Sequence, residues 1–151
     1  DPKKQMQVIK ECCEDENEYL GEYGATLYDK LEDALKELSK NHKLFIVSNC
    51  QDGYIECFFK AHKLDKYFID YECPGRTGLP KGENIKLIVE RNNLKNPVYV
   101  GDTQGDANAA QLANVLFISA KYGLGNVDEF FNSLESFDEL LEIIYVRRSK
   151  W

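Results

Sequence analysis

The fold is decided by the stretch VYVGDTQGD at residues 98–106. Its first three residues are all apolar, which is typical of a strand buried on both faces of a parallel sheet. The run ends in Asp102, and a tight turn then leads to Asp106 at the start of an expected helix. Two carboxylates at a strand end are ligands that a hard cation such as Mg²⁺ prefers. Spacing alone leaves a structural interpretation open, in which Asp106 favours the helix N-terminus and Asp102 caps the turn.

The same alternation of apolar strands and helices recurs on both sides of this stretch. Continuously apolar runs predict strands, and apolar residues at helical spacing predict helices. The expected strands are 44–47, 67–69 and 115–118, and the expected helices are 27–38, 54–59, 85–89 and 107–113, with two more between residues 128 and 146 and a loop at 74–80. Alternating elements of this kind predict an α/β fold with a parallel sheet covered on both faces. Ligands bind such sheets beyond the carboxyl ends of the strands.

Three polar residues stand at such positions. Ser48 and Asn49 follow the strand at 44–47, where a hydroxyl and the backbone amides entering a helix can hold a phosphate oxygen. A turn or helix cap is the alternative for this pair. Lys81 opens a helix, where the dipole disfavours a cation unless an anion lies nearby. The alternative for Lys81 is an exposed surface lysine.

The order of these residues along the chain resembles motifs two, three and four of the haloacid dehalogenase superfamily. The resemblance covers roughly residues 21–145. The matching segments are LFIVSN at 44–49, GLPKGENI at 78–85 and VYVGDTQGD at 98–106. The YGLG segment at 122–125 is similar to the phosphoglycolate-phosphatase-like branch.

The resemblance implies a Rossmann-like three-layer sandwich and a phosphatase site. In that site Ser48 hydrogen-bonds the transferring phosphoryl group and Asn49 assists it. Lys81 neutralises the phosphate and the attacking carboxylate, which would otherwise repel each other. Asp102 ligates Mg²⁺, and Asp106 supports the metal or orients Lys81. The implied catalytic residues are therefore Lys81 and Ser48, and the implied substrate is a small phosphorylated metabolite.

Motif one of the superfamily has no counterpart in this sequence. That motif is a strand ending in Asp-x-Asp, which supplies the nucleophile and the general acid and base. No Asp-x-Asp pair occurs in the chain, and none of the aspartates before Ser48 follows an apolar strand. The first strand, which the resemblance places between the strands ending at Ser48 and Asp102, is therefore expected to be missing.

Losing a central strand costs about 10 kcal/mol of apolar burial, comparable to the stability of a whole domain. We therefore expect a fragment whose N-terminal piece is lost or separate, a swapped homodimer, or a slot filled by residues 143–146. Residues 1–20 are expected to be a remnant of a helical cap with its linker. Residues 21–151 are expected to form the core domain.

Two functions fit these features. The first is a Mg²⁺-dependent phosphatase that works through an aspartyl-phosphate in an intact parent, of which this chain is a truncated form. The alternative is a non-catalytic relative that binds phosphate or a partner. A response-regulator receiver is excluded because receivers place their acidic residues first and their lysine last. A dinucleotide-binding domain is excluded because neither GxGxxG nor GxxxxGK[ST] occurs.

Composition narrows the possible partners and setting. The 151 residues carry a formal net charge of −7, and no basic face is visible, so nucleic-acid binding is not expected. The five cysteines form no CxxC pair, which argues against zinc. No apolar run approaches the roughly 20 residues that cross a bilayer, so no membrane partner is expected. A cytoplasmic protein with reduced thiols is the simplest interpretation.

Overall fold

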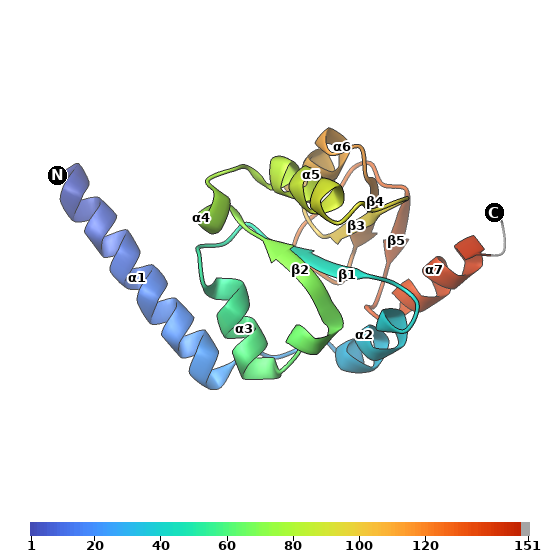
Figure 1. Cartoon of the computed structure of the whole chain (residues 1–151), viewed down its shortest axis with the longest axis horizontal. Helices are drawn as coiled ribbons and strands as arrows, with labels where there is room; N and C mark the ends of the chain where they lie inside the picture. The colour runs from blue at the N-terminus through green and yellow to red at the C-terminus, as the bar shows by residue number, and fades with distance from the viewer. Residues whose placement is uncertain (149–151) are drawn as a thin grey trace.

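The computed structural model describes residues 1–148, whose strands form two parallel sheets. The smaller sheet pairs β1 (Leu44–Val47) with β2 (Phe68–Glu72), as Figure 1 shows. The larger sheet has the order β3 (Val98–Gly101), β4 (Leu116–Ala120), β5 (Asn132–Leu134). The predicted α/β class with parallel strands is confirmed.

The two sheets meet at β1 and β3, where the missing strand was expected. No strand within residues 1–148 is hydrogen-bonded between them. Instead the Tyr99 hydroxyl on β3 donates a hydrogen bond of 2.7 Å to the Val47 carbonyl on β1. Leu44 and Val98 also pack against the buried Leu38 in one core cluster. Side chains therefore join the two sheets where backbone hydrogen bonds do not.

Helices cover both faces of this pair of sheets (Figure 1). One face carries α5 (Lys81–Arg91) and α6 (Gln104–Leu112), whose Ile85 and Ala109 pack with Val115. The other face carries α2 (Leu31–Ser39), α3 (Tyr54–His62) and α7 (Glu139–Arg148). The result is the expected three-layer sandwich.

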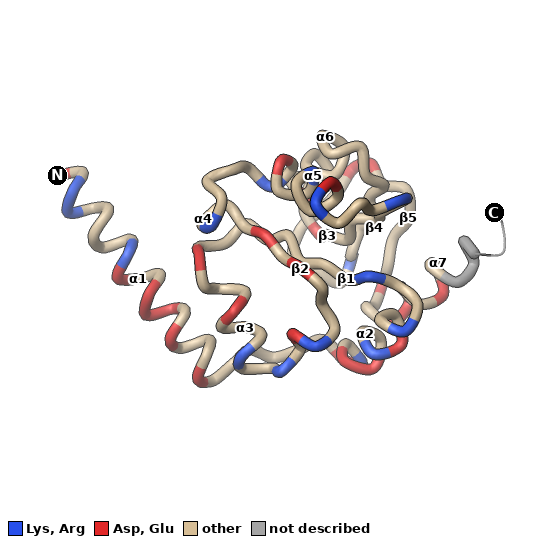
Figure 2. The backbone as a smooth tube through the Cα atoms, viewed as in Figure 1, with Lys and Arg blue, Asp and Glu red and all other residues tan. Residues whose placement is uncertain are grey.

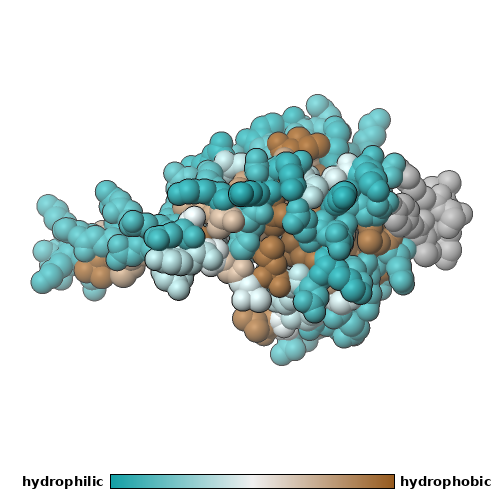
Figure 3. Space-filling view, turned by 90° about the horizontal axis from the view of Figure 1, so that it is seen from below, coloured by the Kyte–Doolittle hydropathy of each residue, from teal (hydrophilic) through white to brown (hydrophobic). Residues whose placement is uncertain are grey.

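The first helix, α1 (Pro2–Tyr23), lies partly outside this sandwich (Figure 1). Its last turns pack on α3, where Leu20 and Gly21 are buried. Its first half projects from the body (Figure 1) and leaves Met6 67% and Ile9 57% exposed. Figure 3 shows an apolar patch on this projecting arm. Acidic residues line its second half (Figure 2). Among residues 1–148 no helix is long and apolar enough to cross a membrane.

Three expectations about local structure were wrong. The segment after residue 128 contains β5 and α7 rather than two helices. The expected loop at 74–80 contains a short helix, α4 (Pro74–Thr77). Tyr67, expected in the strand at 67–69, instead ends the 3₁₀ turn η1 (Asp65–Tyr67), and the strand β2 begins at Phe68.

Residues 143–146 do not fill the slot between β1 and β3, because they belong to α7. Leu140, Leu141 and Ile144 recur at helical spacing, and they pack in the cluster that contains Leu38 of α2. Burial against α2 therefore selects a helix over a strand for this apolar run.

Candidate active site

Lys81 and Asp106 form a buried ion pair at the carboxyl edge of the sheets. Lys81 is the first residue of α5, which follows β2, and Asp106 lies in the first turn of α6, which follows β3. The Lys81 Nζ donates to Asp106 Oδ1, and the two side chains are only 14% and 7% exposed. The structure thus brings together two residues that lie far apart in the sequence, and Lys81 is not a free surface lysine.

Asp106 is held by a capping box at the start of α6. Thr103 is the N-cap residue, and its hydroxyl accepts from the Asp106 backbone N–H. Asp106 Oδ2 in turn accepts from the backbone N–H of Thr103 at 3.1 Å, from its hydroxyl at 2.9 Å and from the Asp102 N–H at 3.2 Å. Burial raises the pKa of Asp106, but the hydrogen bonds from Lys81 and Thr103 outweigh it and hold the pKa below the ordinary value of an aspartate. With both oxygens engaged, the contacts of Asp106 support the orientation of Lys81 rather than metal ligation.

Asp102 is the carboxylate that remains open to a cation. Its Oδ2 accepts a 2.8 Å hydrogen bond from the Leu124 N–H, whereas its Oδ1 accepts none from residues 1–148. Within that same range, no group of three or more His, Cys, Asp or Glu side chains is arranged to hold a metal ion. One hard oxygen donor fits Mg²⁺, which takes about six oxygen ligands, many of them from water and substrate phosphates. The chain therefore offers one ligand of such a site.

Ser48 and Asn49 lie at the end of β1, in the segment that leads to α3. The Ser48 N–H donates to the Glu72 carbonyl at 3.2 Å, which continues the β1–β2 pairing by one residue. Ser48 is half-buried and Asn49 is exposed. Among the described residues, no hydrogen bond or ion pair joins either of them to Lys81, Asp102 or Asp106.

Tyr99 connects the Ser48 side of the site to the Lys81 side. Its hydroxyl binds the carbonyl of Val47, the residue before Ser48, and the Lys81 Nζ lies 5.9 Å from the centre of its ring. Burial raises the pKa of Tyr99, and the charges of Asp106 and Asp102 raise it further. Tyr99 is part of the quoted motif, but its apolar neighbours gave no signal of this polar contact.

Two other side chains near the site have structural contacts. Burial raises the pKa of the Cys50 thiol to about 11, which is consistent with a packing role. Arg76 lies with its guanidinium 5.2 Å from the centre of the Tyr71 ring and its Nε 3.9 Å from Glu72.

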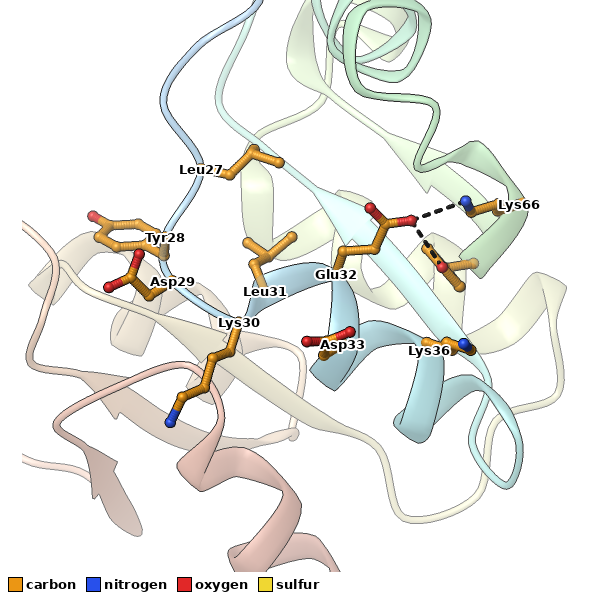
Figure 4. A pocket seen from close by; sticks show the side chains of 10 residues that line it. Leu27, Tyr28, Asp29, Lys30, Leu31, Glu32, Asp33, Lys36 and Lys66 are labelled. Atoms are coloured by element: carbon orange, nitrogen blue, oxygen red, sulfur yellow. Dashed lines mark hydrogen bonds and ion pairs between the residues drawn. The ribbon is translucent and has the colours of Figure 1, made fainter.

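A hollow of about 810 Å³ at the start of α2 lies apart from these residues (Figure 4). Glu32 accepts from Lys66 at 2.9 Å and from the Tyr67 hydroxyl at 3.0 Å within it. Lys30 at its rim pairs with Asp138 of the segment before α7 at 2.8 Å. Of its lining charges, Glu32 and Lys66 pair with each other, and none of the predicted site residues lines it.

A family comparison matches most of the chain. The model of the haloacid dehalogenase-like hydrolase family matches residues 1–120, and the chain therefore belongs to that family. Among curated proteins, no relative matches.

Solved structures with the same fold include three phosphatase or hydrolase relatives. The HAD-hydrolase YfnB from Bacillus subtilis, bound to magnesium, has a TM-score of 0.74 and 21% identity over 85% of this chain. A predicted phosphatase from Clostridium acetobutylicum has a TM-score of 0.71 and 24% identity over 79% of the chain. A predicted phosphoglycolate phosphatase from Haemophilus somnus has a TM-score of 0.71 and 22% identity over 79% of the chain. The chain spans 59%, 60% and 57% of these three proteins, respectively.

Proposed function

We propose that this chain is the core of a Mg²⁺-dependent phosphatase of small phosphate monoesters. The observation that carries the proposal is the buried Lys81–Asp106 pair beside the open Oδ1 of Asp102. Lys81 would neutralise the phosphate and an attacking carboxylate, and its ion pair with Asp106 supports this role by fixing the position of the charge. Ser48, with Asn49, would hydrogen-bond the phosphoryl oxygens from the end of β1.

Asp102 would be the ligand from this chain to Mg²⁺. When bound, the ion would neutralise charge on the phosphoryl oxygens. The Asp102 carboxylate fits this role because it is an oxygen donor with one unengaged oxygen at a strand end.

The nucleophile would come from a strand that enters between β1 and β3, in a longer parent or in a second polypeptide. Two features support this part of the proposal. The described strands pair into two separate sheets at this point, and no Asp-x-Asp occurs in the chain. A parallel strand in this position would end beside both Ser48 and Asp102, where an aspartyl-phosphate would have to form.

Residues 1–20 would belong to a cap that covers the site. The exposed Met6 and Ile9 lie on the same face of α1 as Leu20, which is buried against α3. Residues at this spacing share one helix face, so the apolar face that begins at the body continues along the projecting half. A cap packed on that half would cover these side chains.

Phosphate binding tests the proposal without requiring turnover. In the presence of Mg²⁺, calorimetric titration with inorganic phosphate is expected to show binding to the wild-type chain. Lys81→Met should weaken it at least about tenfold, because a charged hydrogen bond of roughly 1.5 kcal/mol is removed. The matched control is Lys95→Met, which removes the same charge from an exposed position. No binding by the wild type, or equal binding by both variants, would contradict the proposal.

Turnover separates the phosphatase from its alternative. Because no Asp-x-Asp pair occurs in it, the isolated chain is expected to show no Mg²⁺-dependent hydrolysis of an aryl phosphate. Hydrolysis that Asp102→Ala abolishes would show that this chain or a second copy supplies a nucleophile. In a parent that contains the preceding segment, hydrolysis is expected, and its absence there would favour the non-catalytic alternative.

A further inference from the structure

The loop after β4 contacts Asp102 through its backbone. Tyr122 begins this loop, packs beside the cluster of Ile118 and Leu134, and meets the Tyr28 ring edge-on at a centroid distance of 4.8 Å. Burial raises the pKa of Tyr122 to about 12, and the charge of Asp102 adds to it. The start of the loop is therefore anchored in the core close to the predicted metal ligand.

Beyond this anchor, the loop approaches Asp102 too closely for any side chain to intervene. A Cβ placed on Gly123 would lie 2.3 Å from the Asp102 Cβ and 2.4 Å from its Oδ2. A Cβ placed on Gly125 would lie 2.3 Å from the Asp102 carbonyl oxygen. Neither glycine has a left-handed backbone, since the positive-φ glycines are residues 24, 53 and 78. Close approach to Asp102, rather than backbone conformation, is what requires glycine at both positions.

The residue between the two glycines supplies the contact. The Leu124 N–H donates a 2.8 Å hydrogen bond to Asp102 Oδ2, while the Leu124 side chain is fully exposed. Burial of that side chain contributes nothing to the position of the loop tip. What the tip offers is therefore its backbone N–H, which is directed at one of the two carboxylate oxygens.

We propose that residues 123–125 form a clamp that fixes the Asp102 carboxylate, engaging Oδ2 and presenting Oδ1 to the cation. The inference rests on the proposed function, because it takes Asp102 as the Mg²⁺ ligand. Residues 123–125 are then positioning residues, which act through Asp102 and touch neither metal nor substrate. Removing a residue that hydrogen-bonds a metal ligand typically weakens metal binding about 10- to 100-fold.

The hydrogen bond itself is tested in the metal-free chain. A ¹H–¹⁵N spectrum should show the Leu124 amide proton shifted downfield, because its acceptor is a carboxylate. Asp102→Ala should move this signal upfield. An unchanged Leu124 signal in Asp102→Ala would overturn the clamp, whatever the affinity for metal.

The effect on the metal is tested by titrating Mg²⁺ into the chain in the presence of inorganic phosphate. Gly123→Ala is expected to raise the dissociation constant for Mg²⁺ about tenfold or more. The matched control is Gly105→Ala in the first turn of α6, where a Cβ would meet nothing closer than the Thr103 hydroxyl oxygen at 3.6 Å. This control should bind Mg²⁺ like the wild type. Circular dichroism shows whether each variant is folded.

A second variant covers the case in which Gly123→Ala fails to fold. Leu124→Pro removes the N–H donor and puts the ring Cδ where the N–H pointed at Asp102 Oδ2, so the carboxylate loses the hydrogen bond and has to move away from the loop. It should weaken Mg²⁺ binding to a similar extent. If the wild type binds Mg²⁺ and the folded loop variants bind it equally well, the clamp is wrong and the proposed function stands. If the wild type does not bind Mg²⁺, the proposed function fails and the inference fails with it.

Discussion

Helix α5 carries a cation at each end, and the two cations differ in what holds them there. Arg91 lies in the last turn, where the helix dipole favours a positive charge, and it binds Asp70 and Glu72 of β2. Lys81 is the first residue, where the same dipole disfavours a positive charge, and it binds Asp106 of α6. Because the dipole favours Arg91 and disfavours Lys81, we infer that the two cations have different roles.

The Arg91 end fastens β2 to the helix that covers it. Arg91 donates two hydrogen bonds to Asp70, of 2.8 and 2.9 Å, and one of 2.8 Å to Glu72. The Glu72 side chain is only 3% exposed, and its Oε2 has no hydrogen-bond partner. Arg91 is therefore the main compensation for a buried charge. The Lys81 end, by contrast, lies at the strand ends beside the open oxygen of Asp102.

The largest effect on stability is expected from Arg91→Met. Removing Arg91 leaves the buried Glu72 carboxylate with a single charged partner among the described residues, Arg76, whose Nε is 3.9 Å away. The free energy of unfolding should therefore fall by about 3 kcal/mol. Urea denaturation measures this change. The control is Lys86→Met on the same helix, whose pair with Glu83 is exposed at 38% and 43% and should contribute less than about 1 kcal/mol. Equal losses in both variants would show that the Arg91 end is no stronger than a surface pair.

A smaller loss of stability is expected from Lys81→Met, although it removes a more buried cation. Asp106 keeps three hydrogen-bond donors from Asp102 and Thr103, so its charge stays partly compensated. We expect a fall of about 1 to 2 kcal/mol in the free energy of unfolding. The same substitution is proposed above to cause a large loss of phosphate affinity. If Lys81→Met lowered the free energy of unfolding as much as Arg91→Met, Lys81 would stabilise the fold as strongly as Arg91 does, and the proposed difference between their roles would be wrong.

The sequence predicted the residues around Lys81, at the start of α5, better than those around Arg91, at its end. The ends of the apolar runs at 44–47 and 98–100 located the strand ends and hence Ser48 and Asp102. Glu72 and Arg91 gave no comparable signal, although Asp70 and Glu72 stand two residues apart on one face of a strand. A pair of acidic residues at that spacing inside a buried strand requires a cation, and this was the signal available.

Tertiary contacts decided what local patterns could not. β5 has a single apolar residue, Leu134, and becomes a strand because it pairs with β4. The contacts of Tyr99 with Val47 and of Leu124 with Asp102 join residues 52 and 22 positions apart. No spacing rule predicts such contacts, because they depend on how the two sheets and the last loop come together.

The smallest effect is expected in how the contribution of Asp106 to the free energy of unfolding changes with pH. Burial raises the pKa of Asp106, but Lys81 and Thr103 lower it more, so the folded pKa lies below the ordinary value of an aspartate. A lowered pKa contributes stability that is complete above the unfolded pKa and is lost as the pH falls through the folded one. The stability difference between the wild type and Asp106→Asn should therefore be constant above about pH 5 and narrow at lower pH.

Urea denaturation of both proteins over this pH range measures the difference. Asp70→Asn is the matched comparison, because hydrogen bonds from Asn92, Tyr71 and Arg91 outweigh burial and lower the pKa of Asp70 as well. In a Lys81→Met background, the stability difference that Asp106→Asn makes should depend much less on pH, because Lys81 contributes most to lowering the pKa of Asp106. The stability difference that Asp70→Asn makes should still shrink at low pH in the Lys81→Met background, because the cation that pairs with Asp70 is Arg91, at the other end of α5. The stability difference that Asp106→Asn makes could instead shrink at low pH to the same extent with and without Lys81. In that case Thr103, and not Lys81, would stabilise the Asp106 carboxylate.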